Sequence, residues 1–274
     1  MLGSAIIVFR EVLEAALIIG IIAAATRNLP TRNAWLIAGI AAGIVGSLIV
    51  ASLTGQIADM AEGVGQELFN AGILALAAMM LAWHNIWMAR HGAQLARDAK
   101  KLGAEVASGG REMSALALVV ALAILREGSE TALFLYGMLA GGSESVASIV
   151  GGGLTGLAVG MLAGFGLYAG FLNIPPRLFF ASTSGLILLL ACAMSSQVAR
   201  FLVQADLLPS LGNPFWNTSW LLDNGSIPGR FLHTLIGYEA MPSGIQVVFY
   251  MATMVLILTG MYLVRPRTPS LSTA

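Results

Sequence analysis

Long runs of apolar residues, separated by short polar segments, dominate the chain. Seven of these runs are long enough to cross about 30 Å of hydrocarbon as helices, at about 1.5 Å per residue. They lie near residues 2–25, 34–55, 68–90, 113–140, 146–170, 178–203 and 244–264. This pattern predicts an all-α integral membrane protein with seven transmembrane helices.

The composition supports this class. The chain is 57% hydrophobic and 10% charged, whereas about a quarter of the residues of a soluble domain are charged. The single cysteine, Cys192, excludes an internal disulfide framework. The segment "AAAT" at 23–26 resembles a signal-peptide cleavage site, but no positive charge precedes this apolar run and three charges interrupt it. We therefore expect the first run to be retained.

Basic residues fall on one side of the predicted membrane. If all seven runs cross, ten lie on the side of the C-terminus and only Arg200 and Arg230 lie opposite. The ten are Arg27, Arg32, Arg90, Arg97, Lys100, Lys101, Arg111, Arg177, Arg265 and Arg267. The positive-inside rule then predicts a cell-membrane protein whose N-terminus is outside and whose C-terminus is cytoplasmic.

Most acidic residues outside the spans fall on the other, outer side. Asp59, Glu62 and Glu67 lie there, around the start of the third span. Acidic groups at an entrance raise the local concentration of cations. We therefore include Asp59 and Glu62 as candidates for an ion pathway.

The chain also repeats itself. The segment "REVLEAAL" at 10–17 returns as "REGSETAL" at 126–133, and Gly39 and Gly43 of the second span match Gly152 and Gly156 of the fifth. Because each copy has three spans, the two copies must insert in opposite directions, which is the inverted repeat of many transporters. The spacing of the glycines favours close helix packing.

These patterns divide a single permease domain, 1–274, into five parts. They are a first repeat at about 2–90, a cytoplasmic linker at 91–112, a second repeat at about 113–203, an extracytoplasmic loop at 204–243 and the seventh helix at 244–264. Apolar residues recur at helical spacing in the linker. Either an amphipathic helix on the inner membrane surface or a solvated connector would give this pattern.

Charged residues in the first and fourth spans are the candidate site. Arg10, Glu11 and Glu14 lie within about 100° of one another on a helix, and the fourth span repeats the set as Arg126, Glu127 and Glu130. Each charge costs about 2.5–3.5 kcal/mol at the centre of a membrane helix, so these faces must turn inward. Two antiparallel spans would then bring four carboxylates and two guanidiniums together, and a cation would complete the charge.

A purely structural alternative pairs each arginine with the glutamate four residues later. That pairing leaves Glu11 and Glu127 without a counter-charge, which favours a functional site. Carboxylate oxygens favour hard ions such as Fe³⁺ or Fe²⁺ and do not exclude magnesium, manganese or calcium. The histidine spacings of zinc and di-iron enzymes do not occur in the sequence.

Two further residues are weaker candidates. Glu67 begins the third span at the outer face and would receive an ion there, although a solvated helix-start carboxylate explains it equally well. His84 lies further along the same span, towards the inner side. It would line an exit, but a hydrogen bond between helices is the simpler interpretation.

Two R-E-x-x-E motifs, in the first and fourth of seven spans, resemble the oxidase-dependent iron permease family of fungi and bacteria, also called the iron/lead transporters. The resemblance covers the whole chain and includes "GQELFNAGI" at 65–73 and "GYEAMPS" at 237–243. It implies iron-binding roles for Glu11, Glu14, Glu127, Glu130 and Glu67, with Arg10 and Arg126 in support. It also implies a separate oxidase or iron-delivery protein as partner.

From these features we expect a high-affinity iron permease, not an enzyme, that imports Fe³⁺ or Fe²⁺ through a mid-membrane site. Iron is the transported substrate, no cofactor is expected, and the bilayer rather than nucleic acid surrounds the chain. A proton-coupled transporter of another divalent cation is the main alternative. A membrane oxidoreductase with a di-metal centre and a structural subunit are further alternatives, and the lack of histidine motifs disfavours the oxidoreductase.

Overall fold

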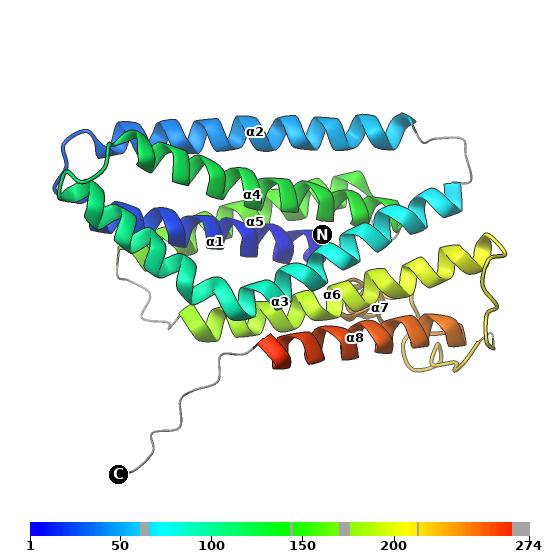
Figure 1. Ribbon diagram of the computed structural model, residues 1–274. Coiled ribbons are helices and arrows are strands. Elements are labelled where there is room, and N and C mark those ends of the chain that lie inside the picture. Colours follow the sequence, from blue (N-terminus) through cyan, green and yellow to red (C-terminus); the bar gives the residue numbers. More distant parts are fainter. Residues whose placement is uncertain (61–65, 143–144, 170–175, 213, 265–274) are drawn as a thin grey trace, which may run out of the picture.

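The computed structural model describes residues 1–274 except 61–65, 143–144, 170–175, 213 and 265–274. Every regular element in these residues is a helix. The helices are α1 (Leu2–Ala25), α2 (Arg32–Met60), α3 (Gln66–Ala107), α4 (Ser114–Ala140), α5 (Val146–Tyr168), α6 (Pro176–Gln204), α7 (Ile227–Ile236) and α8 (Gly244–Val264) (Figure 1). The all-helical prediction is confirmed for this part of the chain.

The long helices differ in whether their length and composition suit a membrane span. Five described helices are long and apolar enough to cross a membrane: Arg32–Gln56, Glu67–Gly92, Val146–Tyr168, Ser184–Gln204 and Gly244–Val264. Helices α1 and α4, with 24 and 27 residues, are also long enough, but each contains an arginine and two glutamates near its middle. The charges that distinguish these two helices are those of the candidate site.

Helix α3 differs most from the sequence-based expectation. It runs for 42 residues without interruption, so it continues the predicted third span through most of the linker 91–112. The apolar face of the linker, with Ala99, Leu102 and Val106, is buried against residues of α1, α2 and α4 such as Ile22 and Leu116. This face therefore packs on the protein rather than on the membrane surface, because the ends of three other helices offer it an apolar surface.

The segment 204–243, expected as a loop, also contains a helix. Ser226 caps the start of α7 by accepting a hydrogen bond from the backbone N–H of Gly229, at 3.0 Å. Gly237 ends α7 in the left-handed conformation, with φ at 70°, which glycine adopts without strain. Trp220 is exposed in the preceding segment.

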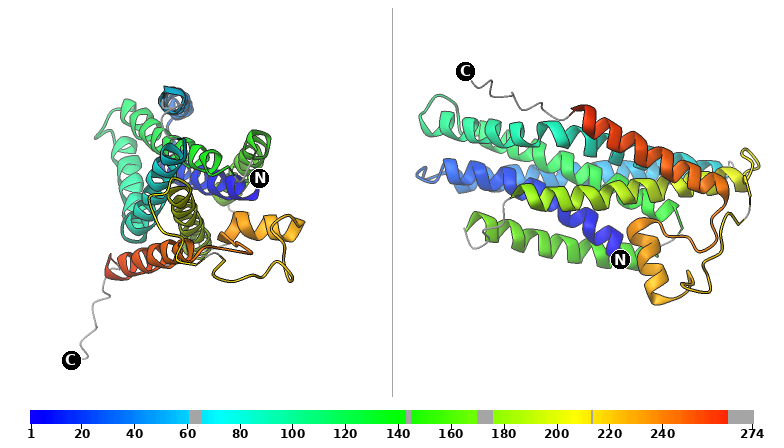
Figure 2. Two further views of the ribbon diagram at one scale, coloured as in Figure 1. Left: turned by 90° about the vertical axis from the view of Figure 1, so that its right-hand side faces the viewer. Right: turned by 90° about the horizontal axis from the view of Figure 1, so that it is seen from below.

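The helices pack in pairs that join the two predicted repeats. Helix α1 lies along α5, α2 along α4 and α3 along α6, while α1 also contacts α4. Helices α1 and α4 run in opposite directions in Figure 1. Viewed along the bundle, α2 and α8 lie at opposite edges (Figure 2).

Glycines allow the closest of these contacts. A Cβ atom on Gly39 would lie 2.6 Å from the carbonyl oxygen of Ala117 in α4, and a Cβ on Gly156 would collide with the backbone of Ala5 in α1. Gly43 and Gly152 are equally constrained. The packing role expected of these four glycines is confirmed, and it brings α4 and α1 into the interior.

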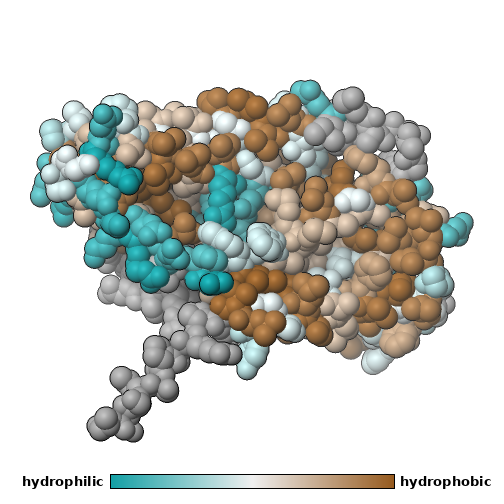
Figure 3. Space-filling view, viewed as in Figure 1, coloured by the Kyte–Doolittle hydropathy of each residue, from teal (hydrophilic) through white to brown (hydrophobic). Residues whose placement is uncertain are grey.

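One end of the bundle is more polar than its flank. The end of α1, the start of α2, the end of α3 and the start of α4 all lie at the left of Figure 1. Hydrophilic residues gather at this end in Figure 3, while apolar residues cover much of the adjoining flank.

Candidate metal centre

Helix α1 supplies one half of the site. Arg10, Glu11 and Glu14 are at most 4% exposed. The guanidinium of Arg10 contacts both carboxylates, with Nη1 2.9 Å from Glu11 Oε1 and Nη2 2.7 Å from Glu14 Oε1. A buried cation that touches two carboxylates fixes the positions of both. The expectation that Glu11 lacks a counter-charge is therefore wrong, because Arg10 pairs with Glu11 as well as with Glu14, and ion pairing alone does not favour a functional site over a structural one.

Helix α4 supplies the other half with a different geometry. Glu127 is 4% exposed, whereas the side chains of Glu130 and Arg126 are 16% and 35% exposed. Nε of Arg126 lies 3.1 Å from Glu130 Oε1 and 3.8 Å from Glu127 Oε1. The Arg126 guanidinium also lies over the ring of Trp87, 4.3 Å from its centroid. In the second motif, as in the first, the arginine contacts both glutamates, but its arginine and second glutamate are more exposed.

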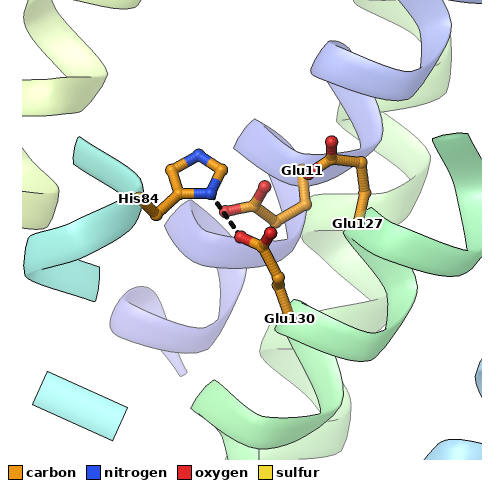
Figure 4. A group of neighbouring side chains, drawn as sticks. All are labelled: Glu11, His84, Glu127 and Glu130. Atoms are coloured by element: carbon orange, nitrogen blue, oxygen red, sulfur yellow. Dashed lines mark ion pairs between the residues drawn. The ribbon is translucent and has the colours of Figure 1, made fainter. Parts of the chain in front are cut away.

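The two motifs meet in the interior together with a residue of α3. One ligand atom from each of Glu11, His84, Glu127 and Glu130 lies within 4.8 Å of the others. Figure 4 shows these side chains pointing toward one another from three helices. The predicted convergence of spans one and four is therefore seen in the structure, although Glu14 lies at its edge.

His84 makes contacts between helices, as the simpler interpretation expected, but its partners are carboxylates of the candidate site, which the sequence analysis did not foresee. Its Nδ1 contacts Glu130 Oε2, and its Nε2 lies 3.7 Å from Glu14 Oε2. The imidazole thus lies between a carboxylate of each motif. The donor set combines three carboxylates with an imidazole, rather than oxygen alone. One indication of this role was present in the sequence: His84 is an ionisable residue within an apolar span, and such residues usually belong to functional sites.

The charges of the cluster suit a cation. Four carboxylates face two guanidiniums, and three of the carboxylates are at most 4% exposed. Glu11 Oε2 and Glu127 Oε2 are buried, and no arginine, histidine or backbone N–H of the described residues donates a hydrogen bond to either. Buried acceptors without donors are costly unless something else satisfies them. A metal ion among these oxygen atoms would do so.

The other candidate residues lie elsewhere. Glu67 is exposed in the first turn of α3, and seventeen residues, about 25 Å of helix, separate it from His84. The structure therefore does not bring Glu67 to the cluster. Glu62 lies outside the described residues, and so does the side chain of Asp59.

Neighbouring residues support the cluster. Next to His84, Asn85 donates a hydrogen bond of 3.0 Å to the carbonyl of Ser184, which ties α3 to α6. Gly128, within the second motif, leaves room for Ser47 of α2. The hydroxyl of Ser129 donates to the Leu125 carbonyl at 2.6 Å. Ser129 therefore bonds to its own helix.

A pocket of about 400 Å³ reaches the cluster between α3 and α4. Its lining consists of Met79, Met80, Trp83, His84, Trp87, Arg126 and Glu130. Three of these seven residues carry the polar groups described above, so the pocket is continuous with the candidate site.

Proteins of known name are similar to most of this chain. The protein named "Ferrous iron permease EfeU" from Yersinia pestis is 27% identical over 250 residues, which cover 89% of this chain and 87% of the relative. The protein of the same name from Escherichia coli O6:H1 is 29% identical over 261 residues, with 89% of each chain covered. No solved structure matches this chain. The family model described as "Iron permease FTR1 family" matches residues 1–265, and the chain therefore belongs to this family of iron permeases.

Proposed function

We propose that this protein imports iron across the cytoplasmic membrane through the cluster of Glu11, His84, Glu127 and Glu130. The observation that carries the proposal is the meeting of these four donors within 4.8 Å inside a bundle of apolar helices. Membership of an iron permease family supports it. The ion would bind among the carboxylates and pass through the bundle rather than react there.

The proposed topology has seven crossing helices, α1 to α6 and α8. The opposite directions of α1 and α4 support it (Figure 1). The pairing of α1 with α5 mirrors the pairing of α4 with α2, as two inverted copies related by a two-fold axis would require. With the basic linker in the cytoplasm, the N-terminus lies outside and the C-terminus inside.

We propose Fe²⁺ as the transported form. Imidazole together with carboxylate is a donor set that iron(II) accepts readily, and His84 adds imidazole to the cluster. The relatives compared above carry the name ferrous iron permease. A site of oxygen atoms alone would favour Fe³⁺, the harder of the two ions. Because His84 adds a nitrogen donor, we now favour Fe²⁺ over Fe³⁺.

The arginines would limit the charge of the empty site. Arg10 holds Glu11 and Glu14, at 2.9 and 2.7 Å, and Arg126 holds Glu130 at 3.1 Å. An ion must therefore compete with a guanidinium for each of these carboxylates, and this competition allows binding that is reversible. Release is as necessary for transport as binding is.

A separate extracytoplasmic partner is also proposed, as the family resemblance implies: an iron-delivery protein if Fe²⁺ is the transported form, and an oxidase only if Fe³⁺ is. An oxidase would hand over Fe³⁺ rather than Fe²⁺, so the oxidation state of the substrate also tests this partner. A proton-coupled transporter of another divalent cation uses the same carboxylates as proton sites. It predicts uptake driven by a pH gradient, with iron as a poor competitor.

The test is radio-iron uptake by membrane vesicles that contain the wild type, Glu11→Gln or Glu127→Gln. Uptake is measured with ascorbate to hold Fe²⁺ and, separately, with Fe³⁺ citrate. We expect both variants to lose at least nine-tenths of the uptake, and Fe²⁺ to be the better substrate. Glu105→Gln is the matched control, because Glu105 pairs with Arg111 at 2.9 Å on the polar end of α3. Full uptake by both motif variants would remove the proposed site.

A further inference from the structure

The two arginines of the repeated motif differ in their surroundings. Arg10 is 1% exposed, and both of its terminal nitrogens contact carboxylates. The side chain of Arg126 is 35% exposed, contacts Glu130 through Nε, and stacks on Trp87. Both ends of the Arg10 guanidinium are therefore held by carboxylates, whereas Arg126 has free space on one side.

That free space is the pocket between α3 and α4. His84, Arg126 and Glu130 line it, and the 16% exposure of the Glu130 side chain exceeds that of Glu11, Glu14 and Glu127. A hydrophilic area interrupts the apolar flank of the bundle between α4 and α3 (Figure 3). The cluster can therefore be reached from this flank.

The residues of α3 change in character on the two sides of the pocket. Towards the start of the helix, Leu68 and Leu76 are 50% and 52% exposed. Polar residues appear shortly after Trp87: Arg90 and Gln94 are exposed, and His91 stacks on Trp87 with ring centroids 4.7 Å apart. Trp87 lies five residues before Gly92, where the apolar part of α3 ends, a distance of about 7–8 Å. Water can follow the polar side more readily than the apolar one.

An exposed guanidinium within a membrane needs water or protein around it. The polar continuation of α3 offers water from the inner end. We propose that the pocket is an aqueous vestibule through which the ion leaves the cluster toward the cytoplasm, and that Arg126 stacked on Trp87 is its movable gate. This inference rests on the proposed function and specifies its exit route.

The contacts of Arg126 explain how the gate would respond to the ion. In the structure, Nε of Arg126 lies 3.1 Å from Glu130 Oε1. An ion that binds Glu130 competes with Arg126 for the same carboxylate. The guanidinium is then held mainly by the face of Trp87, an attraction that survives in a wet site. Rotation of Arg126 toward the inner end would open the way out.

Accessibility of an introduced thiol tests this route. The natural Cys192 is fully buried and is replaced by alanine, and Met80→Cys places a thiol in the pocket. Oriented vesicles receive a membrane-impermeant, positively charged methanethiosulfonate reagent on one side at a time. Leu48→Cys is the matched control, because Leu48 is 64% exposed in an apolar groove on α2. Met79→Cys is a second reporter in the same pocket, in case the first variant does not fold.

We expect the pocket thiol to react at least tenfold faster than the control thiol when the reagent is inside, and faster still when Fe²⁺ is bound, because the ion displaces Arg126 from Glu130. Trp87→Ala should raise the rate several-fold, and Trp87→Phe should leave it near that of the parent. Equal rates for the pocket and control thiols, or reaction only from outside, would overturn the proposal. Because the assay does not measure transport, such a result alongside normal iron uptake rejects the exit route and leaves the proposed function standing.

Discussion

The imidazole of His84 lies against Glu14, with Nε2 3.7 Å from Glu14 Oε2, and its other nitrogen contacts Glu130. A residue of α3 thus joins the first motif to the second. This relationship makes His84 part of the same unit as the carboxylates, although no repeat or motif in the sequence connects it to them.

His84→Gln should therefore reduce iron uptake at least tenfold. Glutamine retains a hydrogen-bonding side chain but lacks the imidazole nitrogen that would bind the ion. The measurement is the initial rate of Fe²⁺ uptake as a function of concentration. His233→Gln, on α7 outside the cluster, is the control and should keep most of the activity. If the two variants behave alike, His84 is a hydrogen-bonding residue only.

Glu67→Gln should leave at least half of the uptake at saturating iron. Glu67 is exposed at the start of α3, about 25 Å of helix from the cluster, so it cannot share an ion with the other carboxylates. Any effect should appear as a higher KM at low ionic strength, where an acidic entrance attracts cations most. Loss of the maximal rate in this variant would mean that Glu67 binds the ion during transport.

Iron should stabilise the folded protein through the same cluster. At a hundred times its Kd, a ligand that binds only the folded state adds about 2.7 kcal/mol to the free energy of unfolding. The melting temperature in detergent, measured without oxygen and with Fe²⁺, should therefore rise for the wild type. Glu127→Gln removes one charged donor of the cluster and should lose most of this rise. An equal rise in both proteins would place the bound iron elsewhere.

Gly156→Ala should destabilise the protein by about 1–3 kcal/mol, the usual range for an overpacked site. The new Cβ would collide with the carbonyl of Ala5 in α1. This collision would push α5 away from α1, the helix that carries Glu11. Gly153→Ala is the control on the same helix, because its Cβ would meet Val8 at an ordinary 3.7 Å. Thermal unfolding in detergent compares the two. Equal stability would show that the α1–α5 contact can adjust without cost.

Arg10→Leu should be more destabilising than Arg126→Leu. Removal of Arg10 leaves two buried carboxylates without their partner, a change that typically costs about 3–5 kcal/mol. Arg126 is partly exposed and contacts Glu130 at the edge of a pocket, so solvent compensates for part of its loss. Unfolding of both variants in the same detergent measures the difference. The reverse order would contradict the asymmetry between the two motifs.

The sequence by itself determined the helices and the identity of the charged residues. Apolar runs of membrane length, interrupted at Pro30 and Pro242, defined most helix positions to within a few residues. Helix α8 begins and ends where it was predicted, at Gly244 and Val264. The repeated R-E-x-x-E pattern was visible because local spacing on a helix fixes which residues share a face.

Only the tertiary structure decided which of these residues meet. The position of His84 depends on how α3 crosses α1 and α4, and the burial of the linker face depends on the ends of three other helices. The difference between Arg10 and Arg126 likewise arises because α3 and α4 leave a pocket beside one of two similar motifs. Contacts between helices far apart in the chain are set by packing of whole surfaces, which local spacing does not encode.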